Sequence, residues 1–312
     1  MKSLLKQLPY PISGLMLGLA SLGNLLNMYH PLFRVLFGGL SLIIFIALLA
    51  KMFTFPISLK EGYENPVIAS ILSTFPMSMI ILSTYFSSFA YAIAFGIWRL
   101  GVALMLTWVI FFTRKHVMPF KIEKVFSSYF VLYVGVVVAS LTAPIYGVEA
   151  LGRILFWYGF FIYLLLVPIV TYRVFVVKGI PEPLKPLVII YAAPASRLLA
   201  GYLQSFSDKS VLFVLLLGGW AFLMTLFGLS QMPRLLRQPF YPSYSAFTFP
   251  FVISAVAFNG LTNFLKSEGY ATSFIEPIRI FFILWASIMV VYVLVRYLLF
   301  LSKTTLKKYS KL

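Results

Sequence analysis

The sequence predicts an all-α protein that is embedded in a membrane and crosses it ten times. Hydrophobic residues make up 61% of the 312 positions and charged residues only 11%, whereas a soluble domain carries about 25% charged residues. The apolar runs last about twenty residues, which is the length that a helix needs to cross a bilayer. A membrane β-barrel would instead show alternating segments of about ten residues. Helices are therefore expected to satisfy the backbone hydrogen bonds.

The ten spans follow from the polar breaks between the apolar runs. Two breaks are very short, at Ser87-Ser88 and at Gly147–Glu149, so the spans on either side should pair as antiparallel hairpins. No loop exceeds about twenty residues, which is too short for a separate soluble domain, so residues 1–312 form a single transmembrane domain. We place the spans near 10–27, 32–52, 66–86, 88–112, 127–147, 150–176, 184–206, 209–231, 244–264 and 274–302.

Positive charges lie mostly on one side of the predicted membrane. Of the 25 Lys and Arg residues, eighteen fall in the two termini and the loops on their side, five fall on the opposite side, and two lie inside spans. Because Lys and Arg in short loops accumulate in the cytoplasm, both termini are predicted to be cytoplasmic. The expected location is the inner or plasma membrane of a bacterium or archaeon. Nucleic-acid binding is not needed to explain the net charge of +17, because the basic residues are spread over many loops.

The odd-numbered spans share helix-breaking residues that the even-numbered spans mostly lack. A proline inside a helix removes a backbone hydrogen bond and clashes with the preceding turn, so it bends the helix. The freed carbonyl must be met by protein or water, which favours a position beside a cavity. The pattern predicts five repeated helix pairs, with kinked helices inside and straighter helices outside, although Pro168 in the sixth span does not fit. The breaks are Pro11, Gly14 and Gly18 in the first span, Pro76 in the third, Pro144 in the fifth, Pro194 in the seventh and Pro250 in the ninth.

Short motifs in these spans resemble the tellurite-resistance/dicarboxylate transporter family. They are Tyr10-Pro11-Ile12-Ser13-Gly14 followed by Leu17-Gly18-Leu19-Ala20, the Ala193-Pro194 break, and Phe249-Pro250. The family includes bacterial tellurite-resistance proteins, fungal malate transporters and the slow-type anion channels of plant guard cells. The resemblance covers nearly the whole chain. It implies five helical hairpins around a central pore in each subunit, a homotrimer, and a phenylalanine in the ninth span that closes the pore.

By position this pore gate is Phe249, with Phe247 as the alternative. An aromatic ring in a narrow apolar neck makes a gate because the neck loses its water and imposes a barrier to ions. Gly14 and Gly18 are four residues apart, a spacing that lets helices approach closely. They are either packing residues or residues that widen the pore and leave backbone N–H groups free beside it.

Arg99 and Arg197 both fall near the centre of a predicted span, where a charge costs roughly 2.5–3.5 kcal/mol. No Asp or Glu is predicted inside a span to neutralise them, and arginine stays protonated in proteins. Each guanidinium must therefore meet carbonyls, hydroxyls, water or an anion. Arg197 follows Pro194 on an odd-numbered span, so it either faces the pore and attracts anions or clamps carbonyls between helices. Arg99 lies on an even-numbered span, where a structural role between helices or between subunits is expected.

These features favour an anion-selective channel that conducts small anions passively. Proton relays and cation channels need ionisable groups, mostly acidic, inside the membrane, and the spans are predicted to contain no Asp or Glu. The alternative is a secondary transporter for dicarboxylates or oxyanions such as malate or tellurite. An enzyme would need a catalytic pair inside a span, and we find none. Small inorganic anions or carboxylates, together with membrane lipid, are the expected partners.

The sequence predicts neither a cofactor nor a metal site. It contains no cysteine, which excludes disulfides and thiolate ligands. His30 and His116 lie at predicted span ends, outside any metal-like cluster, and are expected to be solvated. No span carries an arginine at every third position, so a dedicated voltage sensor is not expected.

Overall fold

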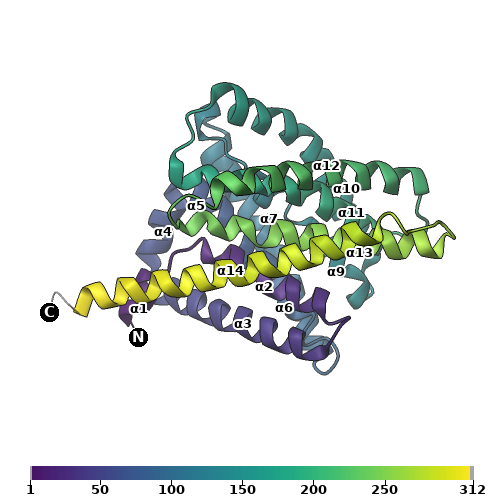
Figure 1. Ribbon diagram of the computed structural model, residues 1–312. Helices are drawn as coiled ribbons and strands as arrows, with labels where there is room; N and C mark the ends of the chain where they lie inside the picture. Colours follow the sequence, from purple (N-terminus) through teal and green to yellow (C-terminus); the bar gives the residue numbers. More distant parts are fainter. Residues whose placement is uncertain (1, 310–312) are drawn as a thin grey trace.

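The computed structural model describes the backbone of residues 2–309 and the side chains of residues 5–303. Over this range the chain forms helices and no β-strand, which confirms the predicted all-α class. The long helices lie side by side in one bundle, and both ends of the described chain lie at the same end of it (Figure 1). There the short helix α1 (Lys2–Gln7) packs against the last helix of the chain.

Five long helices form the outside of the bundle. They are α3 (Pro31–Thr54), α7 (Tyr91–Phe112), α10 (Glu149–Thr171), α12 (Val211–Leu235) and α14 (Glu276–Tyr309). A π-helical turn extends α7 and another extends α10, namely η1 (Thr113–Val117) and η4 (Tyr172–Val177). Their exposed side chains include many large apolar residues, among them Ile43, Leu216 and Leu298. Such a surface is stable against lipid rather than against water.

Five other segments lie inside the bundle, and four of them are interrupted. The continuous one is α2 (Ile12–Leu26). The interrupted ones are α5 (Pro66–Leu72) with α6 (Thr74–Ser83); α8 (Tyr129–Tyr133) with α9 (Val137–Thr142) and the 3-10 turn η3 (Ala143–Tyr146); the 3-10 helix η5 (Glu182–Tyr191) with α11 (Ala192–Ser205); and the 3-10 helix η6 (Pro242–Phe247) with α13 (Phe249–Ser267). In the most apolar 18-residue stretch of each of the three longest inner segments 83% to 89% of the residues are buried, against 22% to 33% in the corresponding stretches of the outer helices.

The proline positions follow junctions between helical segments. The junction residues Ser73, Thr142 and Tyr191 keep right-handed helical backbone angles, whereas Thr248 does not. Pro76, Pro194 and Pro250 each lie in the first turn of the helix that follows a junction, and Pro144 lies in the first turn of η3. The first turn tolerates proline because its N–H would have no helical partner there. Four of the inner segments are therefore divided by such junctions, and of the four prolines only Pro250 follows a residue outside the helical region. Pro168, by contrast, lies within the continuous helix α10.

The inner segments form a closed ring. α2 packs against α6, α6 against α9, α9 against α11, α11 against α13, and α13 returns to α2. Each inner segment also packs against the outer helix that follows it in the chain, so that α2 contacts α3, for example, and α13 contacts α14. The ring is thus completed within a single chain.

The ring closes where α2 meets the start of α13. A methyl group on Gly18 would lie 2.7 Å from Thr248 Cβ, which is closer than two carbon atoms approach. Thr248 Oγ1 lies 3.1 Å from the carbonyl oxygen of Gly14 and 2.7 Å from that of Ser245, and it donates toward them. The small residues of α2 therefore allow the backbone of α13 to approach closely, as expected for the packing interpretation.

The structure bears on the number of spans only in part, and it adds short helices in two of the predicted loops. Eight helices in the described chain are long and apolar enough to cross a membrane. The segments at the first and fifth predicted spans, Ile12–Leu26 and Val137–Tyr146, are apolar but shorter, so ten crossings stay a prediction. The predicted loop after α3 contains a further helix, α4 (Pro56–Glu64), and the loop after η1 contains a short 3-10 turn, η2 (Ile122–Lys124).

The expectation that His116 is solvated is wrong. Its side chain is buried, because Nε2 lies 2.9 Å from the carbonyl oxygen of Tyr63 in α4 and the imidazole packs on Phe112. His30 is exposed, and its Nδ1 accepts a hydrogen bond from Leu32 N at the start of α3. Within the described residues neither histidine belongs to a cluster that could hold a metal ion.

Candidate functional site

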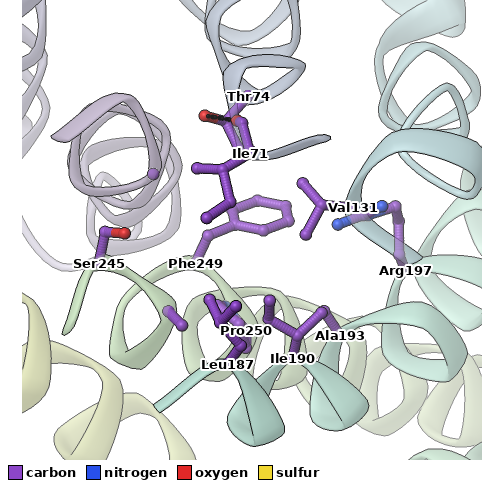
Figure 2. Close-up of a pocket in the computed structure, with 12 residues that line it drawn as sticks. Ile71, Thr74, Val131, Leu187, Ile190, Ala193, Arg197, Ser245, Phe249 and Pro250 are labelled. Carbon is purple, nitrogen blue, oxygen red and sulfur yellow. Dashed lines mark hydrogen bonds between the residues drawn. The ribbon is translucent and has the colours of Figure 1, made fainter. Parts of the chain in front are cut away.

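A small cavity of about 30 Å³ lies inside the ring. Its lining comes from the earlier residues of all five inner segments (Figure 2). Most of the wall is aliphatic, and the polar side chains that border it are Thr74, Ser245 and Arg197. The ring of Phe249 lies at the centre of the lining side chains in Figure 2.

A larger space of about 530 Å³, which we call the vestibule, borders the later residues of the same segments. Four carboxamides and one guanidinium line it: Asn24, Asn27, Gln204, Asn259 and Arg34. No Asp or Glu side chain borders it in the described part of the chain. Because its charged group is a cation and its other polar groups include N–H donors, the potential in the vestibule favours anions.

Among the described residues, Phe249 alone borders both the cavity and the vestibule. Along each inner segment the residues that line the cavity precede those that line the vestibule, apart from the overlap at Phe249 and Pro250, so the two spaces follow one another along the axis of the ring. Phe249 is the first residue of α13, directly after Thr248, which is held against α2. Its side chain is 5% exposed. The aromatic ring therefore lies between the small cavity and the larger vestibule.

Arg197 is a buried cation beside this aromatic ring. Its side chain is 1% exposed, and its Cζ lies 5.1 Å from the centre of the Phe249 ring, within the range of a cation–π contact. Nε and Nη1 have no hydrogen-bond partner among the described residues, and no carboxylate of that part of the chain forms an ion pair with it. The N–H groups at these two nitrogen atoms are therefore buried donors that lack a hydrogen-bond acceptor, which is unfavourable.

Nearly the entire chain matches one protein family. The model of SLAC1, described as voltage-dependent anion channel, matches residues 7–298. The chain belongs to the SLAC1 family. The family comprises anion channels and transporters, including the tellurite-resistance type, so the resemblance seen in the sequence is confirmed and the protein is an integral membrane protein of anion transport. No individual curated protein matches the chain.

The predicted site residues of this SLAC1-family protein occupy different positions around the ring. Gly14, Phe249 and Pro250 line the cavity, Pro144 lines the vestibule, and Gly18, Pro76 and Pro194 line neither space. Phe247 also lines neither, because it is fully buried against the ring of Tyr244, with the ring centres 4.6 Å apart. Of the two candidate gate residues, Phe249 is thus the one that separates the spaces.

Arg99 lies away from the ring, on the exposed surface of α7. Its Cζ is 3.7 Å from the centre of the Phe95 ring, one turn earlier in the same helix. Neither ion pair found in the described residues involves it. Among the described residues, therefore, no ion pair links Arg99 to a second helix. Of the two structural roles predicted for it, its exposed position favours contact between subunits.

Two polar groups of the vestibule were not singled out by the sequence. Arg34 Nη2 donates to the carbonyl oxygen of Thr84 at 2.7 Å, and its Cζ lies 4.9 Å from the centre of the Tyr85 ring. Asn259 Oδ1 accepts a hydrogen bond of 3.2 Å from Arg279 Nη1, which leaves the amide N–H groups of Asn259 for the vestibule. In the sequence, Asn259 could have been singled out because it places a carboxamide in an otherwise apolar span.

Proposed function

We propose that this protein is an anion-selective channel that conducts small anions passively through a pore in each subunit. The observation that carries the proposal is the position of Phe249 between the vestibule and the small cavity. A narrow apolar neck between two spaces loses its water and blocks ions. The Phe249 ring is accordingly the gate, and the ring of inner segments is the wall of the pore.

An anion in this channel meets a favourable group on each side of the gate. In the vestibule, Arg34 and the carboxamides raise the local anion concentration and replace part of the hydration shell. Beyond the gate, Arg197 has N–H donors without acceptors and compensates for the lost water. No acidic side chain of the described residues lines either space, so a cation finds no counter-charge along the path.

The proposed channel has ten spans in one transmembrane domain, arranged as five hairpins, with both termini cytoplasmic, and it assembles as a homotrimer. Packing of each inner segment against the next outer helix supports the hairpins. The two chain ends lie at one end of the bundle (Figure 1), which supports an even number of spans. Closure of the ring within one chain supports a separate pore in each subunit. The exposed charge of Arg99 supports a subunit boundary at α7, because a partner would shield it from lipid.

A secondary transporter for dicarboxylates or oxyanions is the second candidate, and the size of the vestibule favours it. The vestibule, at about 530 Å³, has room for a polyatomic anion, whereas the cavity, at about 30 Å³, does not. A carrier exposes its site alternately to the two sides of the membrane, and its flux depends on a coupled ion. A channel carries current under voltage alone. Current recorded with equal anion concentrations on both sides therefore distinguishes the two.

Planar-bilayer recording of purified wild type, Phe249→Ala and Phe247→Ala tests the gate. Loss of the Phe249 ring joins the two spaces, so conductance should rise well above wild type while anion preference persists. Phe247 borders neither space, so Phe247→Ala should cost about 3–5 kcal/mol of stability and leave conductance unchanged. An unchanged or lower current from well-folded Phe249→Ala would refute the gate, and a rise confined to Phe247→Ala would move it to that residue.

A further inference from the structure

Arg197 touches the aromatic ring that closes the pore. Its Cζ lies 5.1 Å from the ring centre, and both side chains border the same cavity of about 30 Å³. Figure 2 shows the nitrogen atoms of Arg197 on the side that faces Phe249. A cation–π contact is strongest where water is excluded, and both side chains are buried, with 1% and 5% exposure. The contact therefore stabilises the ring in its closed position.

The same contact leaves part of the guanidinium unsatisfied. An aromatic ring attracts the positive charge, but it supplies no lone pair to the N–H donors. Nε and Nη1 have no acceptor among the described residues. Thr74, which also borders the cavity, already donates toward Ser13 Oγ and the Ile71 carbonyl oxygen, at 2.7 and 2.8 Å. An anion in the cavity would supply the missing acceptor and would form charge-assisted hydrogen bonds.

We propose that Arg197 binds one halide-sized anion in this cavity and that its binding releases the Phe249 gate. The gating part rests on the proposed function, because Phe249 must be the gate. The size of the cavity sets the ligand class: about 30 Å³ admits one monatomic anion such as chloride without its water shell, and it excludes a dicarboxylate. Most of the remaining wall is apolar, so Arg197 is the group that compensates for dehydration.

Two effects of the bound anion weaken the closed state. The anion forms an ion pair with the guanidinium and so cancels the charge that attracts the ring. It also brings negative charge next to an aromatic ring whose face is electron-rich. The anion therefore binds more tightly when the ring has moved away, and a difference in affinity between two states shifts the population toward the state that binds better. Binding of the permeating anion therefore favours the open state of the channel.

Anion binding is measured apart from conduction, by thermal unfolding of the purified chain in detergent as chloride replaces gluconate at constant ionic strength. Chloride should raise the unfolding midpoint of the wild type saturably, and Arg197→Gln should abolish this rise. Arg99→Gln is the matched control, because Arg99 also lies over a phenylalanine ring but on the outer surface; it should respond like the wild type. If Arg197→Gln does not fold, Arg197→Lys, which keeps the charge and lacks the planar fork of donors, should weaken chloride binding about tenfold or more.

Gating is measured as open probability in planar bilayers while chloride replaces gluconate on the side of the chain termini. Open probability of the wild type should rise with chloride. The ratio of open to closed channels should be about thirtyfold higher for Arg197→Gln than for wild type, because the loss of a desolvated cation–π contact corresponds to roughly that factor. This ratio should no longer respond to chloride. The single-channel current of Arg197→Gln should fall, since the attracting charge is lost. Phe249→Leu should show the same rise in open probability as Arg197→Gln, and the variant that carries both substitutions should not exceed it.

Two results would overturn the inference. Equal stabilisation of Arg197→Gln and wild type by chloride would exclude the binding site. An open probability of Arg197→Gln at or below that of wild type would exclude the release of the gate. If no variant conducts, Phe249→Ala included, the proposed function fails, and the unfolding experiment still decides the anion site by itself.

Discussion

Substitution of Gly18 by alanine perturbs the proposed gate through the backbone of Thr248 and Phe249 and not through the aromatic ring. The added methyl carbon would lie 2.7 Å from Thr248 Cβ, 2.8 Å from its Oγ1 and 3.2 Å from Phe249 N. Rotation of the Thr248 side chain does not move Cβ, so the relief must come from the backbone. Carbon atoms rest at about 3.5–4.0 Å, so the start of α13 must withdraw from α2 by about 1 Å. Overpacking of this size costs about 1–3 kcal/mol.

Gly39→Ala is the matched control, because Gly39 lies in the outer helix α3 with nothing within 4 Å of the added methyl group. Both substitutions gain the same helix propensity, about 1 kcal/mol, so their difference isolates the clash. Equilibrium unfolding in mixed detergent should show Gly18→Ala less stable than Gly39→Ala by about 1–3 kcal/mol. In bilayers only Gly18→Ala should alter the conductance, since it displaces Phe249. Equal stability and equal conductance of the two variants would refute the reasoning.

Three further predictions concern other parts of the molecule. Arg34→Gln should lower the anion current severalfold at low salt and little at high salt, because salt screens the charge of the vestibule; recordings over a salt series measure this. Trp98→Phe removes the 2.8 Å hydrogen bond from Nε1 to Thr142 Oγ1 and should cost about 1–3 kcal/mol in equilibrium unfolding, with conductance retained. Single cysteines introduced near Lys2 and Lys308 should resist a membrane-impermeant thiol reagent added outside intact cells, and labelling of either would contradict cytoplasmic termini.

Features that depend on local sequence were predictable, and features that depend on distant contacts were not. The helical class follows from composition, and the inner breaks follow from Pro76, Pro194 and Pro250. The closure of the ring depends on Thr248 and Gly14, which are 234 residues apart, and no local pattern indicates that they meet. The burial of His116 has the same origin, since its partner Tyr63 lies in a helix that the sequence suggested was a loop.

The sequence pattern also could not predict which way the side chain of the proposed gate residue, Phe249, points. Phe247 ends the 3-10 helix η6 and Phe249 begins α13, and Thr248 between them has φ −99° and ψ −88°, outside both helical conformations. Helical periodicity assumes one continuous helix, so it cannot predict the register across such a break. Phe249 was preferred to Phe247 because Phe249-Pro250 resembles a family motif. For Arg197 the absence of acids inside the spans did indicate an unpaired charge, but its contact with Phe249 joins two different spans.

The helix breaks have a consequence for selectivity that does not depend on ionisable side chains. Thr74, Ala193 and Phe249 are the first or second residues of α6, α11 and α13, and all three border the cavity. Aligned peptide dipoles place roughly half a positive charge at the N-terminus of a helix. The helix α13 begins after Thr248, whose backbone lies outside the helical region, so a partial positive charge of this kind stands beside the cavity. This charge belongs to the backbone, so neither pH nor side-chain substitution removes it. A chain without the Arg197 charge should therefore keep some preference for anions over cations, because the peptide groups at this helix end also attract anions.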